Sequence, residues 1–230
     1  MRLMKPEPDI LYEDNHIIAV NKSNRDLVQG DKTGDISLDI KVKDYIKKKY
    51  NKPGDVFLGV VHRIDRPVSG VVLFARTSKS LSRLNNMFRE KKIRKIYWAL
   101  IKELPPAETE TLTHYIKRNQ EQNKSYCFDK EVNGSKLAVL EYKIIGKSDT
   151  YYLIEVDLKT GRHHQIRSQL SAIGCPIKGD LKYGFPRSNN YGGISLHARK
   201  IEFIHPVRNE PVIIEAPPPN EETLWRKIEF

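Results

Sequence analysis

The stretch that most constrains the fold of this chain is residues 61–75, VHRIDRPVSGVVLFA, in which a cluster of charges runs directly into apolar residues. Pro67 and Gly70 are typical turn residues, and the apolar run at 71–75 predicts a short buried strand. A carboxylate, Asp65, therefore stands among guanidinium groups just before a rigid core element.

The charges around Asp65 fit two interpretations. On an extended path Arg63 shares a face with Asp65, whereas Arg66 points to the opposite face. Cationic neighbours favour the ionised carboxylate, which is suited to act as a nucleophile or base and poorly suited to donate a proton. A salt-bridge cluster beneath a turn would use the same residues, because ion-pair networks also form away from functional sites.

The chain has an excess of positive charge, with 40 Lys and Arg against 29 Asp and Glu and a formal net charge of +11. This imbalance suits a polyanionic partner such as nucleic acid, although solvated lysines on helix surfaces would produce the same excess. The two cysteines, Cys127 and Cys175, lie far apart and lack metal-ligand spacing. We therefore expect no disulfide framework, no zinc site and a cytoplasmic location.

The length of 230 residues fits one domain, residues 1–230, with room for two lobes. The first ten residues lack the apolar segment of a signal peptide, and no run approaches the roughly 18 apolar residues that a membrane helix needs. We therefore expect neither export nor membrane insertion.

The spacing of apolar residues predicts two helices, which begin near Ser37 and near Thr77 or Ser78. Alternating runs predict a hairpin around Asp14–Asn15, and Asn133–Gly134 predicts another between the segments that flank it. The expected strands cover 10–13, 16–20, 71–75, 96–101, 110–117, 136–145 and 151–158, of which the last two would form an antiparallel pair.

Residues 160–184, TGRHHQIRSQLSAIGCPIKGDLKYG, form a second informative region. The pattern predicts a helix that opens at the Thr-Gly turn and ends at the Gly-Cys-Pro segment. On that helix Arg167 lies at the edge of the apolar face, one turn after His163. An arginine beside a buried stripe needs an anion, which makes Asp65 a candidate partner; an ordinary helix-face arginine is the alternative.

The nonapeptide HRIDRPVSG, followed by VVLFA, resembles the HRLDRxTSG signature of the RluA-type RNA pseudouridine synthases. Ile64 and Val68 stand where that signature usually has Leu and Thr, and neither change affects a charge. Lys22 matches the Lys of a Lys-Pro segment of the family, but Ser23 replaces the Pro. Other similar segments are KIYWA at 95–99, LKTGRHHQIR at 158–167 with His163 in place of Thr, GCPIKGD at 174–180, YG at 183–184, LHA at 196–198 and FIHP at 203–206.

The resemblance covers nearly the whole chain and implies an α+β fold of the pseudouridine synthase type. That fold has a large, mostly antiparallel mixed β-sheet with flanking helices and loops around a central cleft. The implied activity converts specific uridines of structured RNA, rRNA or tRNA, to pseudouridine with base flipping and without a cofactor. Because only 61 residues precede His62 and these are accounted for by a hairpin and a helix, we expect no N-terminal S4-like RNA-binding domain. We also expect a monomer and no obligate protein partner.

The resemblance also implies roles for single residues. Asp65 would be the catalytic carboxylate, which either attacks the ribose carbon or removes a sugar proton. Arg167 would pair with Asp65, and Tyr97 would stack on the extruded uracil and help to remove its C5 proton. Arg66 is a candidate to replace the flipped base in the RNA. The expected RNA-binding residues are Arg63, Arg66, Lys91, Lys92, Lys95, Arg162, His163 and His164.

The histidines do not predict a metal site. His163 and His164 are adjacent on the expected helix and would point in different directions, and His197 and His205 lie in a separate strand-like region. We expect these side chains to contact RNA or to pack.

Two other classes of function stay open. One is a catalytically silent RNA-binding module, against which the intact Asp65 and Arg167 argue. The other is a glycoside- or nucleoside-cleaving hydrolase, which normally needs a second carboxylate facing the first, and the sequence offers no evident partner of that kind for Asp65.

Overall fold

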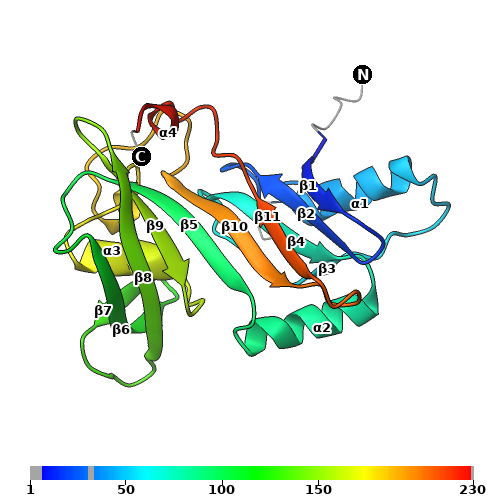
Figure 1. The fold of residues 1–230 in the computed structure, drawn as a ribbon, viewed down its shortest axis with the longest axis horizontal. Coiled ribbons are helices and arrows are strands. Elements are labelled where there is room, and N and C mark those ends of the chain that lie inside the picture. Colours follow the sequence, from blue (N-terminus) through cyan, green and yellow to red (C-terminus); the bar gives the residue numbers. More distant parts are fainter. Residues whose placement is uncertain (1–6, 31–33, 229–230) are drawn as a thin grey trace. The chain divides into compact units, whose positions relative to one another are not determined.

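The computed structural model describes residues 7–30 and 34–228, and these residues contain eleven β-strands, four α-helices and one short 3-10 helix (Figure 1). The chain divides into two compact units. Unit 1 comprises residues 1–93 and 200–217, and unit 2 comprises residues 94–199 and 218–230. Strand β10 (Leu196–Ile204) contributes its first part to unit 2 and its last part to unit 1.

Unit 1 is built around the buried strand that the sequence predicts. Its elements are β1 (Asp9–Glu13), β2 (Ile17–Lys22), α1 (Leu38–Lys49), β3 (Gly59–Val60), β4 (Ser69–Ala75), α2 (Ser78–Arg89) and β11 (Pro211–Glu215). Strands β1, β2 and β4 are antiparallel neighbours in that order, which confirms the hairpin at Asp14–Asn15.

Helices cover both faces of β4, and this explains why every residue of the strand is buried. Val72 and Phe74 pack with Val42 and Ile46 of α1, whereas Leu73 packs with Leu84 of α2. Alternate residues of a strand point to opposite faces, so an uninterrupted apolar run is what a strand between two helices requires.

The start of α2 agrees with the prediction. Thr77 is the N-cap: its hydroxyl accepts a hydrogen bond from the Ser80 backbone N–H, and the Ser80 hydroxyl accepts one from the Thr77 N–H, which forms a capping box. Helix α1 likewise begins directly after Ser37.

Unit 2 is a twisted antiparallel sheet with a helix packed on one face. Its elements are β5 (Arg94–Ile101), β6 (Thr109–Asn119), β7 (Lys124–Phe128), β8 (Lys136–Lys147), β9 (Tyr152–Leu158), α3 (Gln165–Ala172), the 3-10 helix (Leu181–Tyr183) and α4 (Leu224–Lys227). The strand order is β5-β9-β8-β6-β7, and α3 contacts β6 and β7. The predicted pairing of 136–145 with 151–158 is confirmed as β8 with β9.

The prediction at Asn133–Gly134 is confirmed only in part: the predicted segments 110–117 and 136–145 pair as antiparallel β6 and β8, but β7, which the sequence did not predict, lies between them in the chain. A turn is present there, closed by a 2.9 Å hydrogen bond from the Ser135 N–H to the Val132 carbonyl. The flanking strands β7 and β8, however, lie on opposite sides of β6, so this turn belongs to a crossing connection. The true hairpin joins β6 to β7 through residues 120–123, where Asn123 takes a left-handed φ of 45° without a neighbouring glycine.

The eleven strands belong to one mixed sheet, so the expected α+β fold class is confirmed. No helix in the described part of the chain is long and apolar enough to cross a bilayer.

Candidate functional site

Asp65 lies in a tight turn of unit 1 that leads directly into β4. Its carbonyl accepts a 3.0 Å hydrogen bond from the Val68 N–H, which closes the turn. Val68 is buried, Asp65 is half-buried, and the flanking Arg63 and Arg66 are exposed. The turn thus presents a carboxylate and two guanidinium groups at the start of a rigid strand.

The buried ammonium group of Lys22 fixes this turn through hydrogen bonds to backbone carbonyls. Lys22 donates hydrogen bonds to the carbonyls of Ser23 at 2.7 Å, Arg66 at 2.9 Å and Val68 at 2.7 Å. Burial lowers the pKa of Lys22 to about 7, although the carboxylates of Asp26 and Asp65 oppose this shift. Three carbonyl acceptors need three N–H donors, so the ammonium form is the one that ties the turn together.

His62 anchors the other side of the same turn. Its Nε2 accepts a 2.9 Å hydrogen bond from the Leu73 N–H, and its ring stacks on Phe88 of α2 at a centroid distance of 5.0 Å. The turn is therefore attached to β2 through Lys22 and to both β4 and α2 through His62.

Arg66 forms an ion pair with Asp35 at 2.8 Å, and the side chains of both residues are about half exposed, at 46% and 52%. Exposed pairs of this kind contribute little to stability, so the guanidinium can exchange this partner at small cost.

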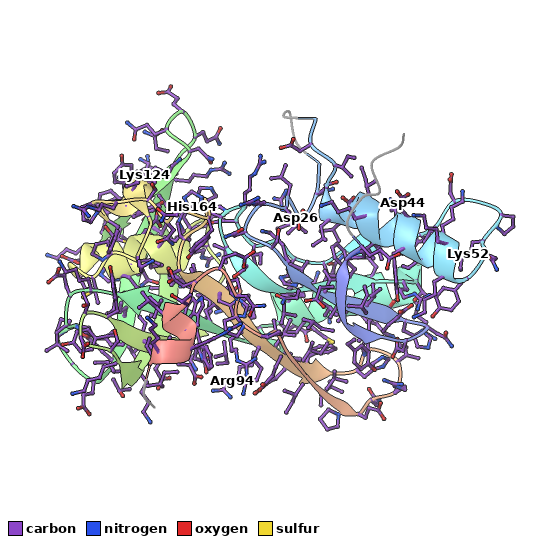
Figure 2. The ribbon with its side chains drawn as sticks, turned by 90° about the horizontal axis from the view of Figure 1, so that it is seen from above. Asp26, Asp44, Lys52, Arg94, Lys124 and His164 are labelled. Atoms are coloured by element: carbon purple, nitrogen blue, oxygen red, sulfur yellow. The ribbon has the colours of Figure 1, made fainter. Side chains whose placement is uncertain are left out.

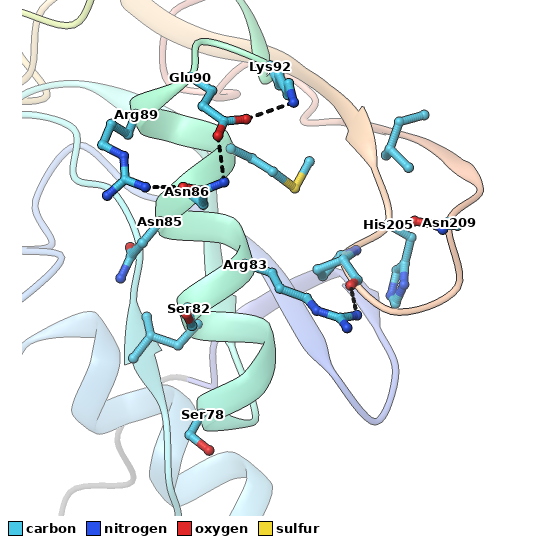
Figure 3. A pocket seen from close by; sticks show the side chains of 14 residues that line it. Ser78, Ser82, Arg83, Asn85, Asn86, Arg89, Glu90, Lys92, His205 and Asn209 are labelled. Carbon is cyan, nitrogen blue, oxygen red and sulfur yellow. Dashed lines mark hydrogen bonds and ion pairs between the residues drawn. The ribbon is translucent and has the colours of Figure 1, made fainter.

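Residues 89–92, at the end of α2 and directly after it, border a polar groove of unit 1 (Figure 3). The groove has a volume of about 980 Å³ and lies between α2 and residues 204–209. Within it Glu90 pairs with Lys92 at 2.7 Å and accepts a hydrogen bond from Asn86 at 2.7 Å, while Arg83 donates to the Pro206 carbonyl at 2.6 Å. Lys92 therefore has an acidic neighbour on this surface.

In unit 2, Arg167 is a buried residue of α3. Its Nε and Nη2 donate to the two carboxylate oxygens of Asp180 at 2.7 and 2.9 Å, and its guanidinium lies 5.0 Å from the centre of the Tyr183 ring. Such two-pronged pairing fixes the plane of the guanidinium. The sequence placed Arg167 at the rim of a helix face, but the structure buries it against an aspartate.

Helix α3 begins at Gln165, later than the Thr-Gly turn at which the sequence predicts its start. His164 takes a left-handed φ of 52° as the N-cap, and His163 precedes the helix. The expectation that His163 lies one helical turn before Arg167 is therefore wrong, as is the placement of both histidines on a helix. Their rings stack on each other at a centroid distance of 3.7 Å.

The stacked histidines are held by neighbours on β7 and the 3-10 helix. His163 Nδ1 lies 2.9 Å from the Ser125 hydroxyl, and His164 Nδ1 lies 2.9 Å from the Tyr183 hydroxyl. The Tyr183 hydroxyl also accepts a hydrogen bond from the Ser125 N–H at 2.8 Å, so it contacts both β7 and His164. Lys124 and His164, which both contact Tyr183, lie at the same end of unit 2 (Figure 2).

Tyr97 and Lys95 lie on β5. Tyr97 is paired with Val156 of β9 and is only 8% exposed. Burial lowers the pKa of Lys95, and the carboxylate of Asp157 opposes this shift. The Nζ of Lys95 lies near Gly161, at an ordinary contact distance of 3.7 Å from the position of a Cβ added there.

The predicted catalytic residues are divided between the two units. Asp65 belongs to unit 1, and Tyr97 and Arg167 belong to unit 2. The sequence did not predict the part played by two further residues. Lys22 binds the turn that carries Asp65, and Asp180 binds Arg167. The signal for Asp180 in the sequence was its place directly after Gly179, which the structure shows to have a left-handed φ of 87°.

Of the other predicted RNA-binding residues, Lys91 is exposed, and Arg162 donates from its Nε to the Leu137 carbonyl at 2.9 Å. Among the described residues, no group of three or more His, Cys, Asp or Glu side chains has the arrangement of a metal site.

Residues 16–172 match the family model described as RNA pseudouridylate synthase. The ribosomal large subunit pseudouridine synthase C of Buchnera aphidicola is 34% identical over 215 residues, covering 90% of this chain and 66% of that protein. An uncharacterised RNA pseudouridine synthase of Bacillus subtilis is 31% identical over 216 residues, covering 93% of this chain and 70% of that protein. The chain thus spans about two thirds of the length of these relatives.

The fold is shared with a human protein, RNA pseudouridylate synthase domain containing 4. The structures superpose with a TM-score of 0.80 at 20% sequence identity and cover 96% of this chain and 94% of the human chain. Together, the matched family model, the relatives and the shared fold establish that the chain belongs to the RluA-type RNA pseudouridine synthases.

Proposed function

We propose that this protein converts specific uridines of structured RNA, ribosomal or transfer, to pseudouridine, with Asp65 as the reacting carboxylate. The observation that carries the proposal is the HRIDRPVSG segment, whose aspartate lies in a turn fixed by Lys22 and His62 ahead of a fully buried strand. A rigid support suits a reacting group, because a small displacement of that group from its substrate lowers the reaction rate strongly.

The reaction breaks the bond between ribose C1′ and uracil N1, turns the base, and forms a bond between C1′ and uracil C5. One proton leaves C5 and one is gained at N1, so the change is an isomerisation that balances without an oxidant, a reductant or a transferred group. Asp65 either adds to C1′ or removes a sugar proton to give a glycal-like intermediate. Both routes need an ionised and oriented carboxylate.

Arg167 and Tyr97 complete the proposed catalytic set on the strength of their motifs. Arg167 would orient Asp65. The two hydrogen bonds to Asp180 fix the plane of the Arg167 guanidinium, and a fixed guanidinium can hold a carboxylate in one orientation. Tyr97 would stack on the uracil once the base has left the RNA stack, and would help to remove the C5 proton.

The basic residues supply the proposed contacts to the RNA. Arg66 would fill the space left by the flipped uridine, a role that the weak exposed pair with Asp35 leaves open to it. The remaining expected contacts to phosphates or the flanking RNA come from Arg63, Lys91, Lys92, Lys95, Arg162, His163 and His164.

The test is a product analysis of wild-type protein incubated with ribosomal and transfer RNA transcribed without modifications. Pseudouridine mapped at discrete positions, with no free uracil, is the expected result. Free uracil in its place would show a hydrolase, and tight RNA binding with unchanged uridines would show a silent RNA-binding module.

A further inference from the structure

One face of the β6–β7–β8 sheet carries aromatic side chains that the proposed reaction does not use. In the strand register Tyr126 lies opposite Lys117, Phe128 lies opposite Tyr115, and Tyr115 in turn lies opposite Leu137. Directly paired residues project from the same face of a sheet. These five residues therefore share one surface, which we call the aromatic face.

The aromatic face is open, whereas the opposite face is covered. Tyr126 is 40% exposed, Phe128 36% and Leu137 44%. Ile116 and Ala138 alternate with these residues and are buried, and α3 packs against β6 and β7 (Figure 1). An exposed apolar cluster on a covered sheet is a typical mark of a binding surface.

Cations border this surface. The Nζ of Lys124 lies 5.5 Å from the centre of the Tyr126 ring, and Lys117 is exposed directly opposite that tyrosine. Arg162 reaches the β8 side of the face through its 2.9 Å bond to the Leu137 carbonyl. A groove of about 440 Å³ runs beside Tyr126 and Phe128, and its charged lining residues are Lys117, Arg118 and Glu121.

We propose that the aromatic face binds a single-stranded segment of RNA, with bases stacked on Tyr126 and Phe128 and phosphates held by Lys117 and Lys124. Exposed aromatic rings interleaved with cations are the usual means of binding single strands, because every base has a face to stack and every nucleotide a negative charge. Bases inside a duplex are already stacked, so the surface selects unpaired nucleotides.

The proposal rests on the proposed function in one respect only, namely that the bound RNA is the substrate. Neither Tyr126 nor Phe128 belongs to the proposed catalytic set. The aromatic face would raise the occupancy of the enzyme by RNA that has unpaired nucleotides near the target uridine, and it would leave the chemical step unchanged.

The test measures the affinity of the full chain for a fluorescent single-stranded RNA of about 12 nucleotides and for a duplex of equal length. The variants are the double substitution Tyr126→Ala with Phe128→Ala, the conservative Tyr126→Phe, and Leu104→Ala as a control at an apolar residue of the same unit that is 64% exposed. Thermal unfolding confirms that each variant is folded.

The double substitution is expected to weaken single-strand binding by about tenfold or more, because each stacked base adds to the affinity. Tyr126→Phe and Leu104→Ala should bind like the wild type. Replacing Lys117 and Lys124 with Gln should lower the dependence of log affinity on log salt by about 0.7 for each phosphate that the protein no longer neutralises. For pseudouridine formation, the double substitution should raise KM and leave kcat unchanged.

Single-strand affinity within twofold of the wild type would overturn the proposal, and so would an equal loss for the duplex. Light scattering compares the self-association of the wild type and the double variant. If the wild type self-associates, the variant does not, and the loss of single-strand affinity follows that change, the proposal is also overturned and the face is assigned to a second copy of the chain. If the wild type binds single strands through this face but forms no pseudouridine, the proposed function fails and the binding surface stands.

Discussion

The turn before β4 in unit 1 and the turn before α3 in unit 2 both lead into buried elements, but different chemistry fixes them. The first depends on one buried ammonium, Lys22, beneath three carbonyls. The second is held by neutral hydrogen bonds: Gln165 accepts from Thr160 and from the Arg162 N–H at 2.8 and 2.9 Å. A turn in which one titratable group makes three of the bonds is expected to respond to a single substitution and to pH, whereas a network of neutral bonds distributes the loss.

The element behind each turn shows the reverse pattern. Strand β4 is fixed by apolar packing on both faces, whereas α3 buries the charged pair of Arg167 with Asp180. The element after the first turn is thus apolar throughout, whereas the element after the second turn carries a buried charged pair. The contrast predicts which substitutions affect stability and which affect activity.

The largest loss of stability is expected for Asp180→Asn. The substitution removes the charge of one partner of the buried pair with Arg167, and breaking a buried ion pair costs about 3–5 kcal/mol. Chemical denaturation measures the free energy of unfolding. Glu90→Gln, in the exposed pair with Lys92, is the control and should change it far less; an equal effect of the two substitutions would refute the difference between the pairs.

Lys22→Met should lower both activity and stability. The substitution leaves three carbonyls without a donor but also removes a buried charge, so we expect a net loss of about 1–3 kcal/mol. The rate of pseudouridine formation should fall by about 100-fold, because the turn that carries Asp65 loses its support. Lys79→Met, at an exposed lysine of α2, is the control, and a rate for Lys22→Met equal to that of the control would contradict the positioning role.

The free energy of unfolding should depend on pH through Lys22. Its pKa is about 7 in the fold, whereas the ordinary value for a lysine is 10.5, so between these values the unfolded chain binds the extra proton. The penalty for burying the charge is complete below pH 7 and is relieved as pH rises, with a slope of at most about 1.4 kcal/mol per pH unit. The free energy of unfolding is measured at pH 7, 8 and 9 for the wild type and for Lys22→Met. The wild-type value minus the variant value should increase from pH 7 to pH 9, and a difference independent of pH would contradict the lowered pKa of Lys22.

The smallest effect is expected for His163→Thr in the turn before α3. The substitution removes the bond to Ser125 and the stack on His164, at a cost of about 1 kcal/mol or less because the rest of the network stays. The melting temperature should stay close to the wild-type value. A loss comparable to that of Asp180→Asn would mean that the second turn also depends on one residue.

Local patterns predicted much of unit 1 from the sequence. The apolar run of β4 and the cap at Thr77 are determined by neighbouring residues, and both agree with the structure. The pairing of β7 was missed, because the choice between β6 and β8 depends on partners distant in sequence. A turn signal such as Asn133–Gly134 shows that the chain reverses, but not which strands it joins.

The candidate site was predictable as a set of motifs but not as a geometry. The resemblance predicts roles for Asp65 and Arg167, whereas the bonds of Arg167 to Asp180 and of Lys22 to three carbonyls became visible only in the fold. Helical periodicity extended α3 too far, because it did not account for the left-handed residue His164. Long-range polar contacts leave no periodic trace in a sequence.

The most direct test of the central claim, that Asp65 reacts with the RNA, is a single-turnover measurement of pseudouridine formation with Asp65→Asn at saturating protein. Asp55→Asn, at an exposed aspartate of the preceding loop, is the matched control. We predict that Asp65→Asn binds the RNA as the wild type does but forms no detectable pseudouridine, while the control retains the wild-type rate. Pseudouridine formed by Asp65→Asn at a rate near that of the control would contradict the account.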